Sequence, residues 1–181
     1  MDPLCQGREA DRVKKSSDLG KRKINLLHIY IDADACPVKN EVYRVAERYR
    51  LKVTLVANAR MRIPYDPRIA LQVVGDNPDE ADDWIAGQVE SGDIVVTADI
   101  LLADRCIKKG AFAIGSTGKM FTEDNIGSAV AMRDLMAELR DAGTVTGGPP
   151  PFSPRDRSRF LQKLDEIIQK IRRLSPPDKS A

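Results

Sequence analysis

One stretch of the chain decides both the fold and the site: Ile29-Tyr30-Ile31-Asp32-Ala33-Asp34-Ala35-Cys36-Pro37. An apolar, β-branched run ends here in two carboxylates. The run predicts a buried parallel strand over residues 25–31, because strands that are covered on both faces are continuously apolar. Alternate side chains of an extended chain point to the same side, so Asp32 and Asp34 should lie close together. Two close anions repel one another unless a hard cation lies between them, and we expect Mg²⁺ or Mn²⁺ there.

The same arrangement occurs a second time. Residues 92–97 contain a short apolar run, Ile94-Val95-Val96, and they are followed by Asp99 and by the start of a helix at Ile100. Because parallel strands bring their carboxyl ends to one edge of the sheet, Asp99 is expected to join Asp32 and Asp34. Asp104 follows about one helical turn later and is a further candidate at the rim.

Apolar periodicity alternates between strand and helix patterns, which predicts an α/β fold with a parallel sheet. Two helix starts carry local signals. Thr122 is expected as an N-cap, and Ser153-Pro154-Arg155-Asp156 combines a cap, a proline at the first position and an acid at the third. Gly118-Lys119 is interpreted as a turn. Strands are expected at residues 25–31, 52–57, 71–74, 93–97 and 111–114, and helices at 38–50, 79–90, 100–109, 123–140 and 154–174.

Composition indicates one soluble domain with tails. The chain has 181 residues, 42% of them hydrophobic and 31% charged, and its formal charge of +2 gives no strong field toward nucleic acid. Residues 24–142 are expected to form the α/β domain. Residues 143–174 are interpreted as a Gly/Pro connector with a C-terminal helix that packs on this domain. Residues 1–23 and 175–181 are expected to be a disordered extension and a disordered tail.

The cysteines and the apolar segments predict a cytoplasmic protein. The chain has three cysteines, Cys5, Cys36 and Cys106, with no CxxC pair, which favours a reducing compartment. No apolar run approaches the length that spans a membrane, and the N-terminus has no signal-peptide core.

Helical periodicity separates the remaining acids. Asp82 falls at the edge of the apolar stripe of its helix, where a side chain reaches a cleft, while Asp83 falls opposite the stripe in solvent. Glu41 has a comparable edge position on the first helix, which leaves it open between a site acid and a solvated one. Asp79 is expected to be a helix N-cap.

Nucleophilic and zinc chemistry are poorly supplied. Cys36 lies beside the acids, and neighbouring anions raise the pKa of a thiol and so oppose formation of the thiolate. The chain has one histidine, His28, in the middle of a predicted strand, where we interpret it as structural. The residues that a Ser-His-Asp triad or a histidine-held zinc site requires are therefore missing.

Several segments together resemble the uncharacterised bacterial YaiI/YqxD family, which is similar to PIN-domain nucleases. The likeness covers residues 24–170. It implies a Rossmann-like, three-layer PIN-like fold with a parallel central sheet and extra C-terminal helices. It also implies an Mg²⁺- or Mn²⁺-binding cluster, which would be Asp32, Asp34, Asp82, Asp99 and Asp104. The segments are Asp32–Pro37, Val56–Asn58, Ala81-Asp82, Thr97–Ala103, Asn125-Ile126, Met132–Asp134, Thr146–Pro149 and Ser153–Phe160.

These residues predict a metal-dependent phosphodiesterase or ribonuclease in which Asp32 and Asp99 are catalytic. The substrate would be RNA or another phosphodiester, with no membrane partner, and the oligomeric state is left open. Basic side chains are candidates to contact phosphates, each with a solvated surface charge as its alternative. They are Arg60, Arg62, Lys119 and Arg133.

Two other functions fit part of the pattern. A HAD-type phosphatase would use Asp32 as its nucleophile, but that chemistry needs a downstream lysine that the sequence does not clearly supply. A non-catalytic nucleic-acid-binding module would keep the fold without turnover. Formation of a covalent aspartyl-phosphate would distinguish the phosphatase from a nuclease. Detectable metal affinity would distinguish a nuclease from the binding module.

Overall fold

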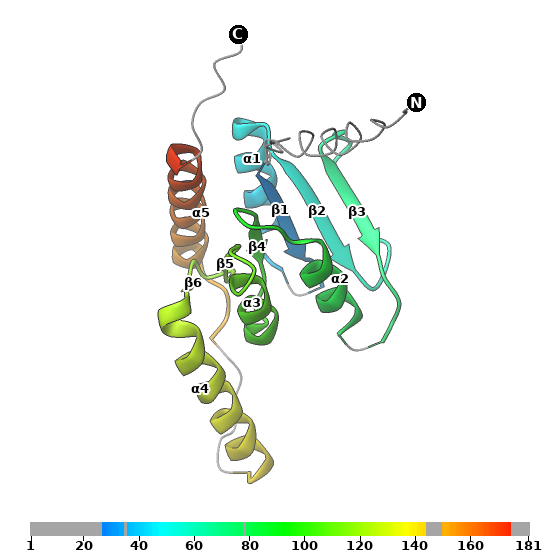
Figure 1. Ribbon diagram of the computed structural model, residues 1–181. Coiled ribbons are helices and arrows are strands. Elements are labelled where there is room, and N and C mark those ends of the chain that lie inside the picture. Colours follow the sequence, from blue (N-terminus) through cyan, green and yellow to red (C-terminus); the bar gives the residue numbers. More distant parts are fainter. Residues whose placement is uncertain (1–26, 35, 78, 144–149, 175–181) are drawn as a thin grey trace, which may run out of the picture.

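The computed structural model describes residues 27–34, 36–77, 79–143 and 150–174 (Figure 1). Within them the chain forms an α/β fold with six strands in one sheet and five helices. The predicted extension (1–23), the predicted tail (175–181) and most of the predicted Gly/Pro connector lie outside the described residues.

The sheet is mostly parallel, with strand order β3-β2-β1-β4-β5-β6. The first five strands run parallel, and β6 runs antiparallel to β5. From β1 the chain builds first to one side, through β2 and β3, and then to the other, through β4 and β5. The sheet therefore has a topological switch point between β1 and β4. The strands are β1 His28–Asp32, β2 Lys52–Ala57, β3 Ile69–Val73, β4 Ile94–Val96, β5 Phe112–Ile114 and β6 Met120–Phe121.

Helices cover both faces of the sheet and make a three-layer arrangement (Figure 1). α1 and α5 pack together on one face, while α2 and α3 cover the other and α4 packs on α3. None of the helices described is both long and apolar enough to cross a membrane. They are α1 Lys39–Tyr49, α2 Glu80–Gln88, α3 Ile100–Ile107, α4 Glu123–Asp141 and α5 Pro154–Leu174.

The first strand is buried on both faces, as its apolar run predicts. Ile29 and Ile31 belong to the core under α1 and α5, and Tyr30 belongs to the core under α2 and α3. The strand begins at His28 and includes Asp32 as its last residue, and residues 25 and 26 lie outside the described part. The alternation of the strand thus feeds two cores at once, which requires the continuous apolar sequence.

The strand prediction was wrong at the far edge of the sheet, where β6 follows the expected last strand. β6 has two residues, Met120 and Phe121, which pair with Ile114 and Ala113. A segment this short has no period that a sequence can reveal. The preceding turn was predicted, and Gly118 occupies it with φ of +81°.

Local capping signals set the helix starts at both C-terminal helices. Asp156 Oδ2 accepts hydrogen bonds from the Ser153 N–H (3.0 Å) and the Ser153 hydroxyl (2.7 Å), and the Thr122 N–H donates to Asn125 Oδ1 (3.0 Å). The predicted starts are confirmed at both places. Asp79 also stands at the N-cap position of α2, but its φ is +67° and its side chain makes no capping hydrogen bond.

α5 closes the face of the sheet that carries α1. Phe160, Leu164 and Ile168 are fully buried in the shared core. Glu41 of α1 is only 3% exposed and pairs with Arg157 Nε at 3.1 Å, so this acid fastens α1 to α5. The interpretation of Glu41 as a solvated acid was wrong, because the acid is buried and pairs with an arginine from the far end of the chain, while its role as a site acid stays a prediction.

The turn before β6 lies directly against α5. A Cβ atom on Gly118 would be 2.8 Å from the carbonyl carbon of Arg159 and 2.9 Å from the amide nitrogen of Phe160. Both are backbone atoms, which cannot move as a flexible side chain does. Gly118 therefore allows both the positive φ and the close approach of the turn to the helix.

Gly118→Ala is expected to lower the free energy of unfolding by at least about 2 kcal/mol, because it adds left-handed strain to a backbone overlap. Gly127→Ala is the matched control. Gly127 is exposed on α4, and an alanine methyl group there would meet nothing within 4 Å, so this change should stabilise the helix by about 0.5–1 kcal/mol. Urea unfolding of the variants measures both. Equal stability of the Gly118→Ala variant and the wild type would contradict the close approach.

Candidate functional site

A buried hydroxyl joins the carboxyl ends of β1 and β4. Ile31 pairs with Val96, so Asp32 and Thr97 come next to each other at the edge of the sheet. The Thr97 hydroxyl donates to Asp32 Oδ2 at 3.0 Å and accepts from the Asp99 N–H at 2.9 Å. Thr97 is buried. Thr97 was not predicted as a site residue. The signal in the sequence is a polar residue at the end of a buried strand, two positions before an acid.

Asp99 is held by the helix that it begins. As the N-cap of α3, its Oδ1 accepts from the N–H groups of Leu101 (2.6 Å) and Leu102 (3.1 Å). The positive end of the helix dipole also favours a carboxylate at this point. Oδ2 of Asp99 makes no hydrogen bond with any of the residues described.

The end of β2 contacts the acidic turn through the backbone N–H of Asn58. Asp34 is exposed in the turn after β1, and its Oδ2 accepts from the N–H of Asn58 at 3.3 Å. Asn58 follows β2 directly. Asp32, Asp34 and Asp99 thus stand at the ends of adjacent strands on both sides of the switch point.

Asp82 approaches the same edge from α2. Burial first, and then the charges of Asp99, Asp32 and Asp79, raise the pKa of this carboxyl to about 6, against the opposing effect of Arg105. Burial also raises the pKa of Asp32, with Asp34 and Asp99 acting in the same direction and Thr97 against it. Asp32 is therefore close enough to Asp34, Asp82 and Asp99 for electrostatic repulsion, and Asp99 also repels Asp82. Asp83 faces solvent, where it pairs with Arg105.

Asp104 is not brought into this group. Its Oδ2 pairs with Lys108 Nζ at 2.6 Å, one turn along α3. Asp104 is also not among the charges that raise the pKa of Asp32 or Asp82. Over the described ranges, no three Asp, Glu, His or Cys side chains are grouped closely enough to hold a metal ion as they stand. The donors nevertheless suit Mg²⁺ or Mn²⁺, since all are hard carboxylate oxygens.

A small cavity lies beside Asp32. Its volume of about 10 Å³ gives room for about one water molecule. Burial raises the pKa of the Cys36 thiol to about 11, so the thiol is protonated at neutral pH, in agreement with the interpretation of Cys36 as a non-nucleophile. Ser116, in the turn after β5, was missed as a site residue because that turn carries no acid. The cavity is lined by Asp32, Cys36, Val96, Thr97, Ala98 and Ser116.

The histidine lies at the other end of the sheet, as a structural group. His28 Nε2 is 2.8 Å from the Thr54 hydroxyl, and the ring stacks on Tyr30 with centroids 4.3 Å apart. Burial lowers the pKa of the imidazole. His28 begins β1 while the acids follow its end, so it is not a base for the carboxylate site.

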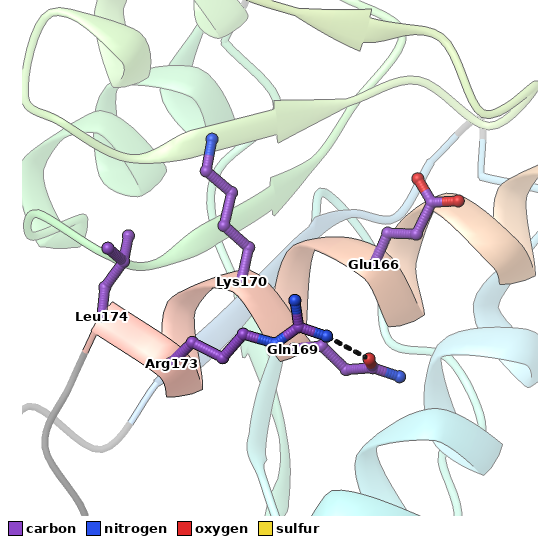
Figure 2. Close-up of a pocket in the computed structure, with 5 residues that line it drawn as sticks. All are labelled: Glu166, Gln169, Lys170, Arg173 and Leu174. Atoms are coloured by element: carbon purple, nitrogen blue, oxygen red, sulfur yellow. Dashed lines mark hydrogen bonds between the residues drawn. The ribbon is translucent and has the colours of Figure 1, made fainter.

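A larger hollow, of about 430 Å³, lies along the end of α5 (Figure 2). Lys170 lies over the ring of Phe112, the first residue of β5, so this hollow is at the edge of the sheet opposite to the acids. Figure 2 shows Arg173 hydrogen-bonded to Gln169 at 3.3 Å. The hollow is shallow and lined by long polar side chains, and the carboxylate group is the better candidate site. Its lining residues are Glu166, Gln169, Lys170, Arg173 and Leu174.

Of the predicted phosphate contacts, Arg60 and Arg62 lie in the loop that leaves β2 at Asn58, next to the turn of Asp34. Both are exposed. Lys119 is exposed beside the turn that contains Ser116, with its ammonium 5.5 Å from the Phe121 ring centroid.

Arg133 lies on α4, which extends beyond the carboxyl ends of the strands in Figure 1. Arg133 is exposed. It also pairs with Asp134 at 3.1 Å.

Comparison with known proteins gives a family without an activity. A family model described as "Uncharacterized BCR, YaiI/YqxD family" matches residues 30–170. A UPF0178 protein of Rhodospirillum rubrum is 59% identical over 148 residues, covering 81% of this chain and 99% of the relative. UPF0178 proteins of Rhodopseudomonas palustris (58%, covering 82% and 94%) and Paramagnetospirillum magneticum (55%, covering 82% and 98%) are similar. No solved structure matches the chain.

Asp82→Asn should stabilise the metal-free protein at pH 7 and not at pH 4. The pKa of Asp82 is raised from 3.8 to about 6 in the folded protein, so the folded form binds its proton more tightly than the unfolded form. Stability is therefore lost as the pH rises through this window, and the loss is complete above it. Allowing for solvent screening, we expect a gain of about 1–2 kcal/mol, or roughly 2–6 °C in Tm.

Thermal melts in EDTA at several pH values between 4 and 7 measure this difference. Asp83→Asn, one residue away and exposed, is the control and should show no such pH dependence relative to the wild type. Parallel Tm curves for the wild type and Asp82→Asn would mean that the folded protein does not raise the pKa of Asp82.

Proposed function

The chain belongs to the uncharacterised YaiI/YqxD family, and from its site we propose that it is a divalent-metal-dependent phosphodiesterase that cleaves RNA. One observation carries the proposal. The carboxylates of Asp32, Asp34 and Asp99 lie where β1 and β4 end at the switch point, the place where open α/β sheets bind their ligands, and Asp82 of α2 is repelled by Asp32 and Asp99. Such a concentration of negative charge opposes folding unless a cation or a function compensates it.

The likeness to PIN-domain nucleases is part of this proposal, and two features support it. The parallel strands have the order β3-β2-β1-β4-β5, and the acids follow β1 and β4.

Asp32, Asp34, Asp82 and Asp99 would hold Mg²⁺ or Mn²⁺. Asp104 is left outside this proposed set because Lys108 already pairs with it. When bound, such an ion activates a water molecule and neutralises charge that develops on the phosphate.

The protein residues hold this site in place and attract the substrate. Thr97 fixes the carboxylate of Asp32, and the first turn of α3 fixes that of Asp99. The exposed guanidinium groups of Arg60 and Arg62, and the ammonium of Lys119, would meet substrate phosphates at the rim. The near-neutral net charge of +2 provides little long-range attraction, so binding would rest on these local contacts.

Mn²⁺ is expected to raise the Tm of the wild type, because a bound ion relieves the repulsion among the acids. At a metal concentration one hundred times Kd, the stabilisation would be about 2.7 kcal/mol. Asp32→Asn and Asp99→Asn should lose most of the shift. Asparagine caps a helix about as well as aspartate does, so Asp99→Asn should keep the fold. Asp83→Asn is the control, and an identical shift in all four proteins would place the metal elsewhere.

Mixed-sequence single-stranded RNA should be cleaved slowly in Mn²⁺, with steep loss of binding as salt rises. EDTA should stop the reaction, and Asp99→Asn should reduce it by at least about 100-fold, since a positioned metal supplies several kcal/mol. Asp83→Asn should cleave normally.

A generic phosphomonoester incubated in parallel separates the alternatives. Hydrolysis of the monoester alone, with phosphate trapped on Asp32, would favour the HAD-type phosphatase. No turnover of either substrate, with metal bound, would favour the nucleic-acid-binding module.

A further inference from the structure

A lysine that the sequence pattern did not single out lies inside the acidic turn. Lys39 is in the first turn of α1, and its Nζ donates to the backbone oxygen of Ala33 at 3.0 Å. Ala33 separates Asp32 from Asp34 and is fully buried. The same Nζ lies 4.0 Å from Met61 Sδ in the loop that leaves β2. The ammonium therefore sits between the acidic turn and that loop.

This placement is unusual for a lysine. The first turn of a helix carries the positive end of the helix dipole, which disfavours a cation. Ordering a lysine side chain also loses up to about 2 kcal/mol of rotamer freedom. Lys52, at the start of β2, is exposed and shows the ordinary situation. The position of Lys39 is thus set by the acidic turn, against local preference, as is typical of functional sites.

The charge of Lys39 is felt in the site itself. It lowers the pKa of the Cys36 thiol, against the larger effect of burial, and Cys36 lines the cavity beside Asp32. Lys39 is only partly buried. An ammonium has three N–H donors. The Ala33 oxygen accepts from one of them and Met61 Sδ from a second, which leaves one N–H group.

We propose that Lys39 is a phosphate-binding residue of this site, fixed by the Ala33 carbonyl and Met61 Sδ, with its remaining N–H group for a substrate phosphate oxygen. The inference rests on the proposed function, which places a phosphodiester at the carboxylates. An anionic substrate is repelled by four acids, and a metal ion offsets only part of that repulsion. Lys39 supplies a fixed positive charge within the acidic turn, next to the loop of Arg60 and Arg62.

The test uses the purified full chain in Mg²⁺, with inorganic phosphate as the probe and calorimetry as the measurement. Lys39→Gln should weaken phosphate binding by about tenfold or more, the effect of losing one charge-assisted hydrogen bond. Lys39→Arg, which keeps the charge, should restore part of the affinity. Lys52→Gln removes the same charge at the opposite edge of the sheet and should bind phosphate as the wild type does.

Two further readouts separate phosphate binding from a structural role. The Mg²⁺-induced rise in Tm should persist in Lys39→Gln. If RNA is cleaved, KM should rise about tenfold with little change in kcat, because binding is lost equally in the ground and transition states. A lower Tm of Lys39→Gln with unchanged phosphate affinity would show a purely structural lysine and overturn the proposal.

The outcomes also distinguish this proposal from the proposed function. Phosphate binding that requires Lys39, without any RNA cleavage, would support the phosphate site and overturn the nuclease. RNA cleavage with the same KM in the wild type and Lys39→Gln would support the nuclease and overturn the role of Lys39 in phosphate binding. Absence of phosphate binding to the wild type would overturn the role of Lys39 directly.

Discussion

The parallel pairing of β1 with β4 is the constraint on which the rest of the structure depends. It places Ile31 beside Val96, and so it sets Asp32 against Thr97, which comes 65 residues later in the sequence, with Asp99 two residues further on. The chain adds β2 and β3 on one side of β1 and β4 and β5 on the other, which keeps the carboxyl edge of the sheet between β1 and β4 open. Because β1 is apolar on both faces, helices must cover both sides of the sheet. This places a core on each face of β1 and leaves the acids at its end.

The site is a local electrostatic conflict that its surroundings reduce. Desolvation and mutual repulsion oppose the ionised forms of Asp32 and Asp82. The Thr97 hydroxyl and the amides at the start of α3 act in favour of the charged carboxylates, and the ammonium of Lys39 lies in the same turn. Arrangements of this kind sacrifice stability at one place and are maintained by a well-packed remainder. Here the remainder is supplied by the fully apolar strands and by the closure of α5 over α1.

Features that depend on neighbouring residues could be predicted from the sequence. Contacts between residues that are far apart in the sequence could not. The apolar run before Asp32 and the Ser153–Asp156 cap are read within a few residues, and both were predicted. β6 escaped because two residues have no period. Glu41 was misjudged because its burial depends on an arginine of α5, and Thr97 and Lys39 were missed because their partners are set by the folded backbone. The roles of the acids as metal ligands stay a prediction, since residue positions alone do not report occupancy.

The position of α5 at the end of the chain has a consequence for biosynthesis. The face of the sheet beneath α1 is completed by Phe160, Leu164 and Ile168, which a ribosome adds after every strand has been made. A nascent chain therefore presents a broad apolar sheet surface to the cell until the last helix emerges. Chains that depend on such late, distant contacts fold slowly and are prone to aggregate before completion. Truncation within α5 would leave this protein in that state, making it a substrate for chaperones and proteases rather than a smaller working domain.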